Sequence, residues 1–204
     1  PNPPPGFPKT ADTFTRGAKS LAQRYLISPE VFAQEQERIF FTQWLCVGHQ
    51  SQIPKAGDFF LQEVVGESVV ILRDTQGAVR AFHNVCRHRG TRLCVEPSGH
   101  LAAIQCPYHA WTYGLDGSLL GAPHMEQISG FEKAEHSLHA VHLALWEGFV
   151  FVNLAVQPQP FATMFASVLD KFMHWNISSL RAAKRTEYEV RANWKLIFQN
   201  YSEC

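Results

Sequence analysis

The sequence predicts a mainly β domain of antiparallel strands, preceded by one helix and followed by the start of a second region. Three observations predict it. Short β-branched and aromatic runs fill the middle of the chain, tight turns separate them, and apolar residues adopt helical spacing after the QPQP segment at 157–160. We therefore expect three parts, at 1–40, 41–155 and 156–204.

The composition is that of a globular protein without a charge bias. The 204 residues are 46% hydrophobic and include 18 Lys+Arg against 18 Asp+Glu. This balance gives no field that would attract nucleic acid or an anionic membrane. No run reaches the roughly 18 apolar residues of a membrane helix, and the first residues lack a secretory pattern. We expect a cytoplasmic protein with neither nucleic acid nor membrane as a partner.

The N-terminal part combines an arm and a helix. The first 27 residues are rich in Pro, Gly and Thr at their start and show no period, so we expect an arm that needs a partner surface. Ser28 is a suitable N-cap, Pro29 suits the first turn, and Glu30 is favourable to the helix dipole. These signals predict a helix over 29–40.

The middle of the chain alternates between strand-like runs and turns. The runs are DFFLQEVV, SVVILRD, AVRAFHNV, AAIQC, AWTYGLDGSLLG, LHAVHLALW and GFVFVNL. Turn sequences occur at 74–77, 115–118 and 147–148. The pattern predicts an antiparallel meander.

The last part begins with a helical pattern. Its apolar residues fall on one helix face, and they are Phe161, Phe165, Val168, Leu169 and Phe172. An alternating piece near Tyr188 and Val190 follows, and then the apolar segment NWKLIFQNYSEC. We expect a second domain to begin here.

Two short Cys–His motifs lie within the β region. Cys86 and His88 stand in NVCRHRGTRLC, and Cys106 and His109 follow in CPYHAW after a 17-residue gap. Residues two apart in an extended segment point to the same side, and Pro107 favours a turn that brings the second pair round. Because five scattered cysteines make a poor disulfide framework, we expect these four side chains to meet at a metal.

Two kinds of metal site fit four such ligands. A tetrahedral zinc accepts two thiolates and two imidazoles. A Rieske [2Fe–2S] cluster takes both thiolates on one iron and both imidazoles on the other. Zinc fingers generally keep Cys with Cys and His with His along the sequence, whereas each pair here is mixed. The mixed pairs favour the cluster.

The motifs resemble those of Rieske proteins, and NVCRHRGTRLC with CPYHAWTYGLDGSL is similar to the α subunits of Rieske non-haem iron oxygenases. The segment NWKLIFQNYSEC resembles the approach to their mononuclear-iron site. The resemblance implies an antiparallel Rieske domain at 41–155 with two cluster-binding hairpin loops. It also implies an arm and helix at 1–40 that pack on the catalytic domain, and the truncated start of an α+β catalytic domain at 156–204.

The resemblance implies Cys86, His88, Cys106 and His109 as ligands, and further residues around the cluster. The surrounding residues are Arg89, Tyr108, Trp111 and Tyr113. High-potential Rieske proteins have a disulfide cysteine at the place of Tyr108 and a serine hydroxyl donor at the place of Trp111. Fewer donors stabilise the reduced cluster less, so we expect a low potential. Tyr113 works against this expectation, because high-potential proteins also have tyrosine there and its hydroxyl can donate to the cluster.

Glu203 matches the carboxylate that bridges a cluster histidine to the mononuclear iron of a neighbouring subunit in the resembling oxygenases. That family usually has Asp here, and Glu is associated with members acting on quaternary amines. Both iron-binding histidines and the later carboxylate of the iron site would follow Cys204. This chain alone is therefore expected to be inactive as an oxygenase.

The resemblance implies an oxygenase that takes electrons from a reductase or ferredoxin and passes them to a mononuclear Fe(II). That iron would activate O₂ to hydroxylate or demethylate a small-molecule substrate. A homotrimer is expected, with or without β subunits. The alternative is a stand-alone Rieske electron carrier, but Rieske ferredoxins lack the NWKLIFQNYSEC segment. A zinc-stabilised binding module is the third hypothesis, and it predicts a colourless protein.

Overall fold

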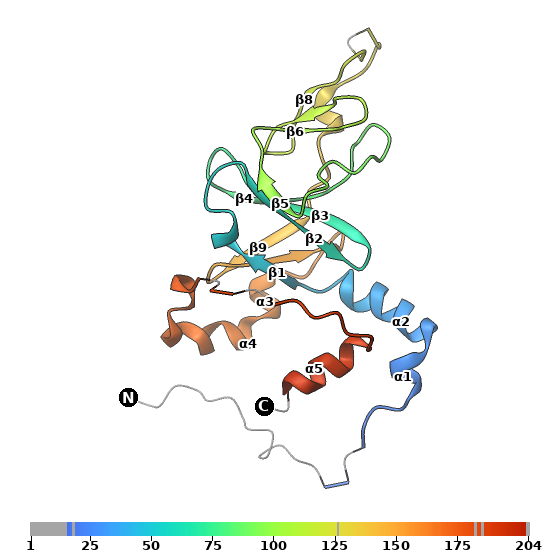
Figure 1. The fold of residues 1–204 in the computed structure, drawn as a ribbon, viewed down its shortest axis with the longest axis vertical. Coiled ribbons are helices and arrows are strands. Elements are labelled where there is room, and N and C mark those ends of the chain that lie inside the picture. Colours follow the sequence, from blue (N-terminus) through green and yellow to red (C-terminus); the bar gives the residue numbers. More distant parts are fainter. Residues whose placement is uncertain (1–15, 18, 126, 182, 185, 203–204) are drawn as a thin grey trace. The chain divides into compact units, whose positions relative to one another are not determined.

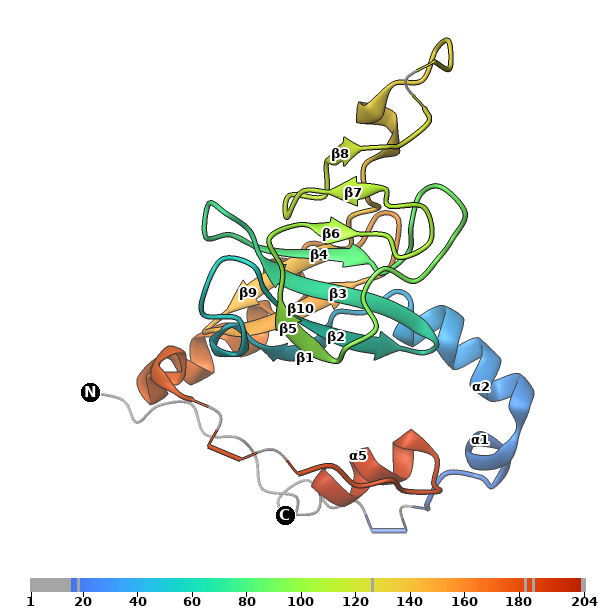
Figure 2. The same cartoon turned by 45° about the horizontal axis from the view of Figure 1, so that its top comes forward.

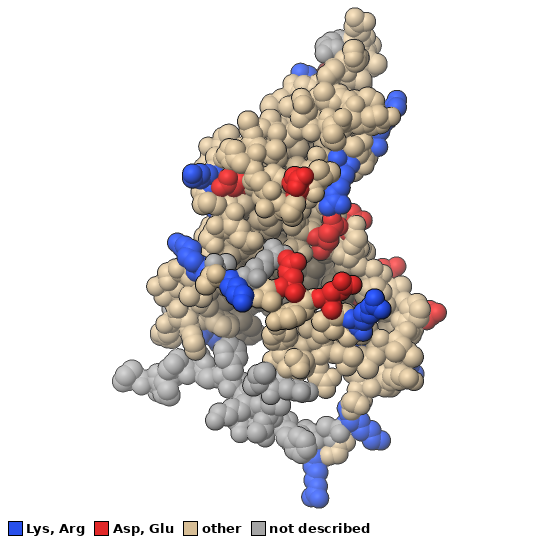
Figure 3. All heavy atoms as spheres, in the orientation of Figure 1, with Lys and Arg blue, Asp and Glu red and all other residues tan. Residues whose placement is uncertain are grey.

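The computed structural model describes residues 16–17, 19–125, 127–181, 183–184 and 186–202. The chain divides into two compact units. One is Phe40–Pro158, and the other joins Pro1–Ile39 to Gln159–Cys204. Among the described residues, no helix is both long and apolar enough to cross a bilayer. On the face drawn in Figure 3, charged groups of both signs are scattered over a largely uncharged surface, in keeping with the balanced composition.

The unit Phe40–Pro158 is built from three antiparallel sheets (Figures 1 and 2), which confirms the predicted mainly β architecture. The first sheet has the order β1 (Leu45–His49), β10 (Phe149–Asn153) and β9 (His142–Trp146). The second has the order β4 (Val79–His83), β3 (Glu67–Arg73), β2 (Asp58–Val64) and β5 (Ser98–His100). The third joins β6 (Ile104–Gln105), β7 (Thr112–Tyr113) and β8 (Leu119–Gly121). Short helical turns occur at η3 (Gln50–Gln52) and η4 (Lys133–His136).

The central strand β3 is buried on both faces, which explains its unbroken apolar run. Val69 and Ile71 point into one apolar cluster, with side chains of β2, β4 and β10. Val70 and Leu72 point into a second cluster, which contains the two Cys–His loops and the small sheet β6–β7–β8. Successive side chains of a strand face opposite sides, so a strand between two cores needs apolar residues at every position. The second cluster is the one that supports the metal motifs.

The turn between β3 and β4 is held by a buried carboxylate. Asp74 accepts hydrogen bonds from the backbone N–H groups of Gln76 and Ala78, at 2.9 and 2.8 Å. Its second oxygen accepts from Nε of Arg80 at 2.8 Å. Gly77 has φ +85°, a conformation that glycine adopts without strain. The turn predicted at 74–77 is therefore present, and Asp74 fixes the register of the hairpin.

The second unit is mainly helical. Its elements are α1 (Arg24–Ile27), α2 (Pro29–Glu35), α3 (Phe161–Met164), α4 (Ala166–Leu169), η5 (Asp170–Trp175), η6 (Ile177–Ser179) and α5 (Trp194–Ser202). A π-helical turn, η2 (Gln36–Phe40), continues α2 to the border of the β unit. Ser28 caps α2, because its Oγ accepts from the N–H of Val31 at 3.2 Å. The predicted helix over 29–40 is thus confirmed, with a π-turn in its last five residues.

Other predictions differ from the structure. The single helix expected after 160 is broken at Phe165, whose φ of −98° and ψ of 8° lie outside the helical region. The alternation at Tyr188 and Val190 forms no strand among the described residues, and both side chains are exposed. The sequence predicted neither β1 nor β5. Cys46 is exposed on β1, whereas Cys94 is buried.

Candidate metal centre

The first Cys–His loop leaves β4 and returns in a tight hydrogen-bonded turn. Cys86 donates its N–H to the carbonyl of Thr91 at 2.8 Å, and Gly90 donates to the carbonyl of Cys86 at 3.0 Å. The base of the loop is closed by Asn84, whose side chain donates to the carbonyl of Cys94 and accepts from its N–H, at 2.7 and 2.8 Å. Asn84 is 3% exposed, so these bonds satisfy a buried amide.

The second loop, between β6 and β7, repeats this construction. Cys106 donates to the carbonyl of Trp111 at 2.8 Å, and Ala110 donates to the carbonyl of Cys106 at 3.0 Å. Ala110 has φ +56°, and Gly90 occupies the equivalent place in the first loop with φ +71°. A left-handed residue four positions after each cysteine thus turns both loops. The two predicted hairpin tips have the same backbone geometry.

The two thiols form one half of the site. Cys86 and Cys106 are each 3% exposed. Burial raises the pKa of the Cys86 thiol, and the neighbouring Cys106 raises it further. The hydroxyl of Tyr113 lies 3.3 Å from Sγ of Cys86 and accepts from the N–H of Arg87 at 3.1 Å. Because the Tyr113 oxygen is already an acceptor, its proton is available for the sulfur of Cys86.

The two imidazoles form the other half. The rings of His88 and His109 have centroids 4.8 Å apart at an angle of 67°. Nδ1 of each is buried and has no hydrogen-bond partner within the described part of the chain. An unsatisfied buried polar nitrogen costs about 1–3 kcal/mol, so two of them side by side call for a ligand. Burial, His109 and Arg89 together lower the pKa of His88, which favours the neutral, metal-binding form.

The donors are therefore sorted by type, thiol with thiol and imidazole with imidazole. A two-iron Rieske cluster needs this division, because each iron takes one kind of ligand. Among the described residues, no group of three or more His, Cys, Asp or Glu side chains is placed to hold a single metal ion. The residues present fit the two-iron group.

Aromatic rings cover both imidazoles. Trp111, 2% exposed, stacks on His88 with centroids 4.9 Å apart and planes at 10°. Tyr108, 60% exposed, lies on His109 with centroids 3.7 Å apart. Trp111 also touches Phe131, at 5.7 Å between centroids, a contact that no local sequence pattern signals. One face of His88 thus lies on a buried core residue, and His109 lies beside an exposed one.

The arginines of the first loop have separate environments. Arg92 forms an ion pair with Glu63. Arg87 hydrogen-bonds the ring of His139 and donates to the carbonyl of Glu135 at 3.2 Å. Arg89 is exposed. Arg92 thus has an acidic partner, whereas the guanidinium of Arg87 contacts a histidine ring and a backbone carbonyl.

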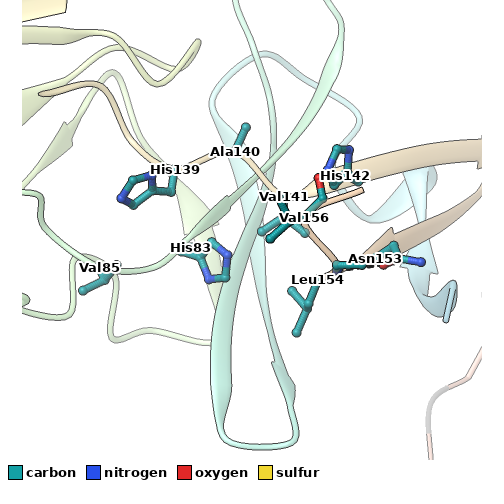
Figure 4. A pocket seen from close by; sticks show the side chains of 10 residues that line it. His83, Val85, His139, Ala140, Val141, His142, Asn153, Leu154 and Val156 are labelled. Carbon is teal, nitrogen blue, oxygen red and sulfur yellow. Dashed lines mark hydrogen bonds between the residues drawn. The ribbon is translucent and has the colours of Figure 1, made fainter. Parts of the chain in front are cut away.

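His139 also lines a pocket of about 500 Å³ beside the first loop (Figure 4). His83 and His142 line the same pocket. Burial, Arg87 and His83 lower the pKa of His139, so its ring is neutral and can accept from Arg87. The four donors are not among the residues that line this pocket.

Glu203, the predicted bridging carboxylate, lies outside the described residues. The segment before it does form a helix, α5. The other predicted site residues are brought together, in two loops and the strand β7.

Comparison with known proteins places this site in a family. Residues 43–132 match the Rieske [2Fe–2S] domain. The chain is 38% identical over 197 residues to the glycine betaine monooxygenase oxygenase subunit of Chromohalobacter salexigens, covering 96% of this chain and 44% of the relative. It is 35% identical over 192 residues to the carnitine monooxygenase oxygenase subunit of Escherichia coli K12, covering 92% and 50%.

Solved structures agree. The apo form of the quaternary ammonium Rieske monooxygenase CntA superposes with a TM-score of 0.82 at 37% identity, covering 89% of this chain and 53% of that one. Naphthalene 1,2-dioxygenase from Rhodococcus sp. matches with a TM-score of 0.67 at 33% identity, covering 71% and 33%. The chain spans about half the length of the curated relatives it matches. It contains a Rieske [2Fe–2S] domain, and it is similar over most of its own length to the oxygenase subunits of Rieske monooxygenases.

Proposed function

We propose that Cys86 and Cys106 bind one iron of the [2Fe–2S] cluster through thiolates, and that His88 and His109 bind the other through Nδ1. The observation that carries this assignment is the pair of buried, unpartnered Nδ1 atoms beside a pair of buried thiols. The matching turns at Gly90 and Ala110 support it, since they aim both loops alike.

When bound, the cluster accepts one electron at a time and releases it again. The surrounding residues stabilise the added negative charge. Tyr113 directs its O–H to the sulfur of Cys86, and its oxygen accepts from the backbone N–H of Arg87. Trp111 has no hydroxyl to offer, so fewer donors reach the cluster than in high-potential Rieske proteins. A low potential follows from this donor count.

For the intact protein we propose a monooxygenase that acts on a quaternary ammonium compound. A substrate C–H group, one O₂, two electrons and two protons would give C–OH and one water. The electrons would come singly from a reductase or ferredoxin, and Glu203 would link His109 to the mononuclear Fe(II) of a neighbouring copy in a homotrimer. The similarity to glycine betaine and carnitine monooxygenase subunits supports the substrate class, as does Glu rather than Asp at 203.

The oxygenase is favoured over a stand-alone electron carrier by the extent of the similarity. The match to the glycine betaine monooxygenase subunit covers 96% of the chain, well beyond the Rieske domain at 43–132. We place the Rieske domain at 41–155 and the start of the catalytic domain at 156–204. The division of the chain into the units Phe40–Pro158 and Pro1–Ile39 with Gln159–Cys204 supports these boundaries.

Anaerobic reconstitution with iron and sulfide tests the ligand assignment. We expect two irons and two sulfides per chain, and loss of the cluster in Cys86→Ser and His109→Gln. The matched controls Cys46→Ser and His142→Gln should keep it. Zinc bound without sulfide, or a cluster that survives both ligand substitutions, would contradict the assignment.

The substrate class has its own test. The intact protein, supplied with a reductase, is incubated with glycine betaine, carnitine and naphthalene. We expect O₂ consumption matched by product only with the two trimethylammonium compounds. Turnover of naphthalene alone would contradict the class.

A further inference from the structure

A partly buried carboxylate, that of Glu35, joins α2 to the start of α5, across a sequence separation of 159 residues. Nε1–H of Trp194 donates to Oε2 of Glu35 at 2.9 Å, and the ammonium of Lys195 binds Oε1 of the same side chain. The side chains of Glu35 and Lys195 are 12% and 15% exposed. Both carboxylate oxygens are therefore engaged by consecutive residues of the first turn of α5.

A second contact lies one residue earlier. Nδ2 of Asn193 donates to the carbonyl of Leu26 in α1 at 3.0 Å. Oδ1 of the same amide accepts from the N–H of Lys195 at 3.1 Å, which caps α5. One side chain thus starts the helix and attaches it to the N-terminal segment. With the Glu35 contacts, the start of α5 is fixed at two places.

The charge of Glu35 is maintained by these contacts. Burial by itself would raise its pKa, but the hydrogen bonds from Lys195 and Trp194 and the charge of Lys195 outweigh burial and lower it. A partly buried pair of this kind adds little net stability, yet removing one partner leaves the other charge unpaired and poorly solvated. Such a pair is better suited to fixing geometry than to adding stability.

We propose that Glu35 is a positioning residue for the electron path, because it sets the direction of the helix that leads to Glu203. This inference rests on the bridging role proposed above for Glu203. Helix α5 covers Trp194–Ser202, and Glu203 is the next residue. Nine helical residues span about 13 Å, so a tilt of about 10° at Trp194 moves the far end by about 2 Å. Hydrogen bonds tolerate only about 0.5 Å of variation, so this tilt would break a carboxylate bridge.

The first test measures the helix itself in this chain. Glu35→Gln keeps an acceptor for Trp194 but leaves Lys195 unpaired. We expect faster hydrogen–deuterium exchange of the α5 amides, with unchanged exchange in β2 and β3. The matched control is Glu37→Gln, which removes the same charge from an exposed glutamate two residues away. Unchanged α5 exchange in Glu35→Gln would overturn the proposal.

The second test uses the full-length protein in single turnover. The reduced cluster is mixed with O₂ and substrate, and its reoxidation is followed by absorbance. We expect Glu35→Gln to slow reoxidation about tenfold or more, since small misplacements in reactive sites have effects of that size. The cluster's spectrum and potential should not change, because the role proposed for Glu35 is confined to helix α5. Glu35→Asp, which retains the charge, should recover part of the rate.

Glu203→Gln separates the two hypotheses. If Glu203→Gln is slow and Glu35→Gln matches the parent, the positioning role is wrong and the bridge stands. If Glu203→Gln itself matches the parent, the bridge is wrong and the positioning role is refuted with it. Trp194→Phe removes one hydrogen bond and leaves the ion pair intact. It should give a smaller slowing of the same kind, and it replaces Glu35→Gln if that variant does not fold.

Discussion

The indole of Trp111 lies flat on the imidazole of His88, with 4.9 Å between ring centroids and 10° between planes. The same indole meets Phe131 and His136 edge-on, at 5.7 and 5.8 Å. Trp111 therefore ties a proposed iron ligand to a segment that belongs to neither Cys–His loop. The orientation of His88 depends on the core as well as on its own loop.

Replacing Trp111 tests this dependence. Trp111→Ala should lower the free energy of unfolding by about 3–5 kcal/mol, the usual cost of emptying a large buried aromatic site. Tyr108→Ala removes an exposed ring that lies on His109, and it should change the free energy of unfolding by only about 0.5 kcal/mol. Urea unfolding of both variants measures the difference. Equal losses in the two would show that the stack on His88 is not a core contact.

Removing the hydroxyl of Tyr113 tests the donor to the cluster. Tyr113→Phe should lower the midpoint potential, because the hydrogen bond to Sγ of Cys86 stabilises the more negative, reduced form. A contribution of about 1 kcal/mol corresponds to roughly 40 mV for a one-electron couple. A redox titration followed by absorbance gives the value, with Tyr108→Phe as the matched control. An unchanged or higher potential in Tyr113→Phe would contradict the account.

Asp74 makes stability depend on acid pH. Burial would raise its pKa, but hydrogen bonds from Arg80, Ala78 and Gln76 outweigh burial and lower it. A carboxylate with a lowered folded-state pKa contributes stability above its unfolded pKa of about 3.9, and this contribution is lost as pH falls through the folded value. Asp74→Asn should therefore cost about 2–4 kcal/mol at neutral pH and flatten the pH dependence below about pH 4.

Urea unfolding at a series of pH values that spans the unfolded-state aspartate pKa of about 3.9 measures this effect. The control is Asp116→Asn. Asp116 is an exposed aspartate in a turn, and hydrogen bonds from Ser118 lower its pKa. Its effect should be smaller because water replaces the lost contacts. If the two variants have the same pH profile, Asp74 does not hold its turn in the way described.

The two loop turns should respond oppositely to exchange of glycine and alanine. Gly90→Ala should destabilise the protein by about 1 kcal/mol, because φ +71° is strained for a residue with a Cβ. Ala110→Gly should be nearly neutral, since relief of strain at φ +56° is offset by a more flexible unfolded chain. Thermal unfolding checks both. An unchanged unfolding temperature in Gly90→Ala would mean that alanine is not strained at this position.

The strands and the approach of the thiol pair and the imidazole pair could be predicted because their signals are local. The run around Val70 and Ile71 and the turn at Gly77 specify a hairpin without reference to the rest of the chain. The spacings of Cys86, His88, Cys106 and His109 likewise define two loops. Their meeting in one place needs only an antiparallel fold, which the turns provide.

The remaining features depend on distant contacts. The packing of Phe131 on Trp111 and the binding of Glu35 to Lys195 link segments that no short pattern relates. Tyr188 and Val190 alternate like a strand but have no neighbouring strand to pair with in the described part of the unit. Alternation indicates a strand only where a sheet edge is available.

The most direct test of the account is the ligand set of the reduced cluster. Pulsed EPR of the one-electron-reduced chain, with ¹⁵N-labelled histidine, detects nitrogen bound to iron. The account predicts coupling to two histidine nitrogens, reduced in His88→Cys and unchanged in His142→Gln. A cluster without histidine coupling would contradict the assignment of His88 and His109, and with it the Rieske site proposed here.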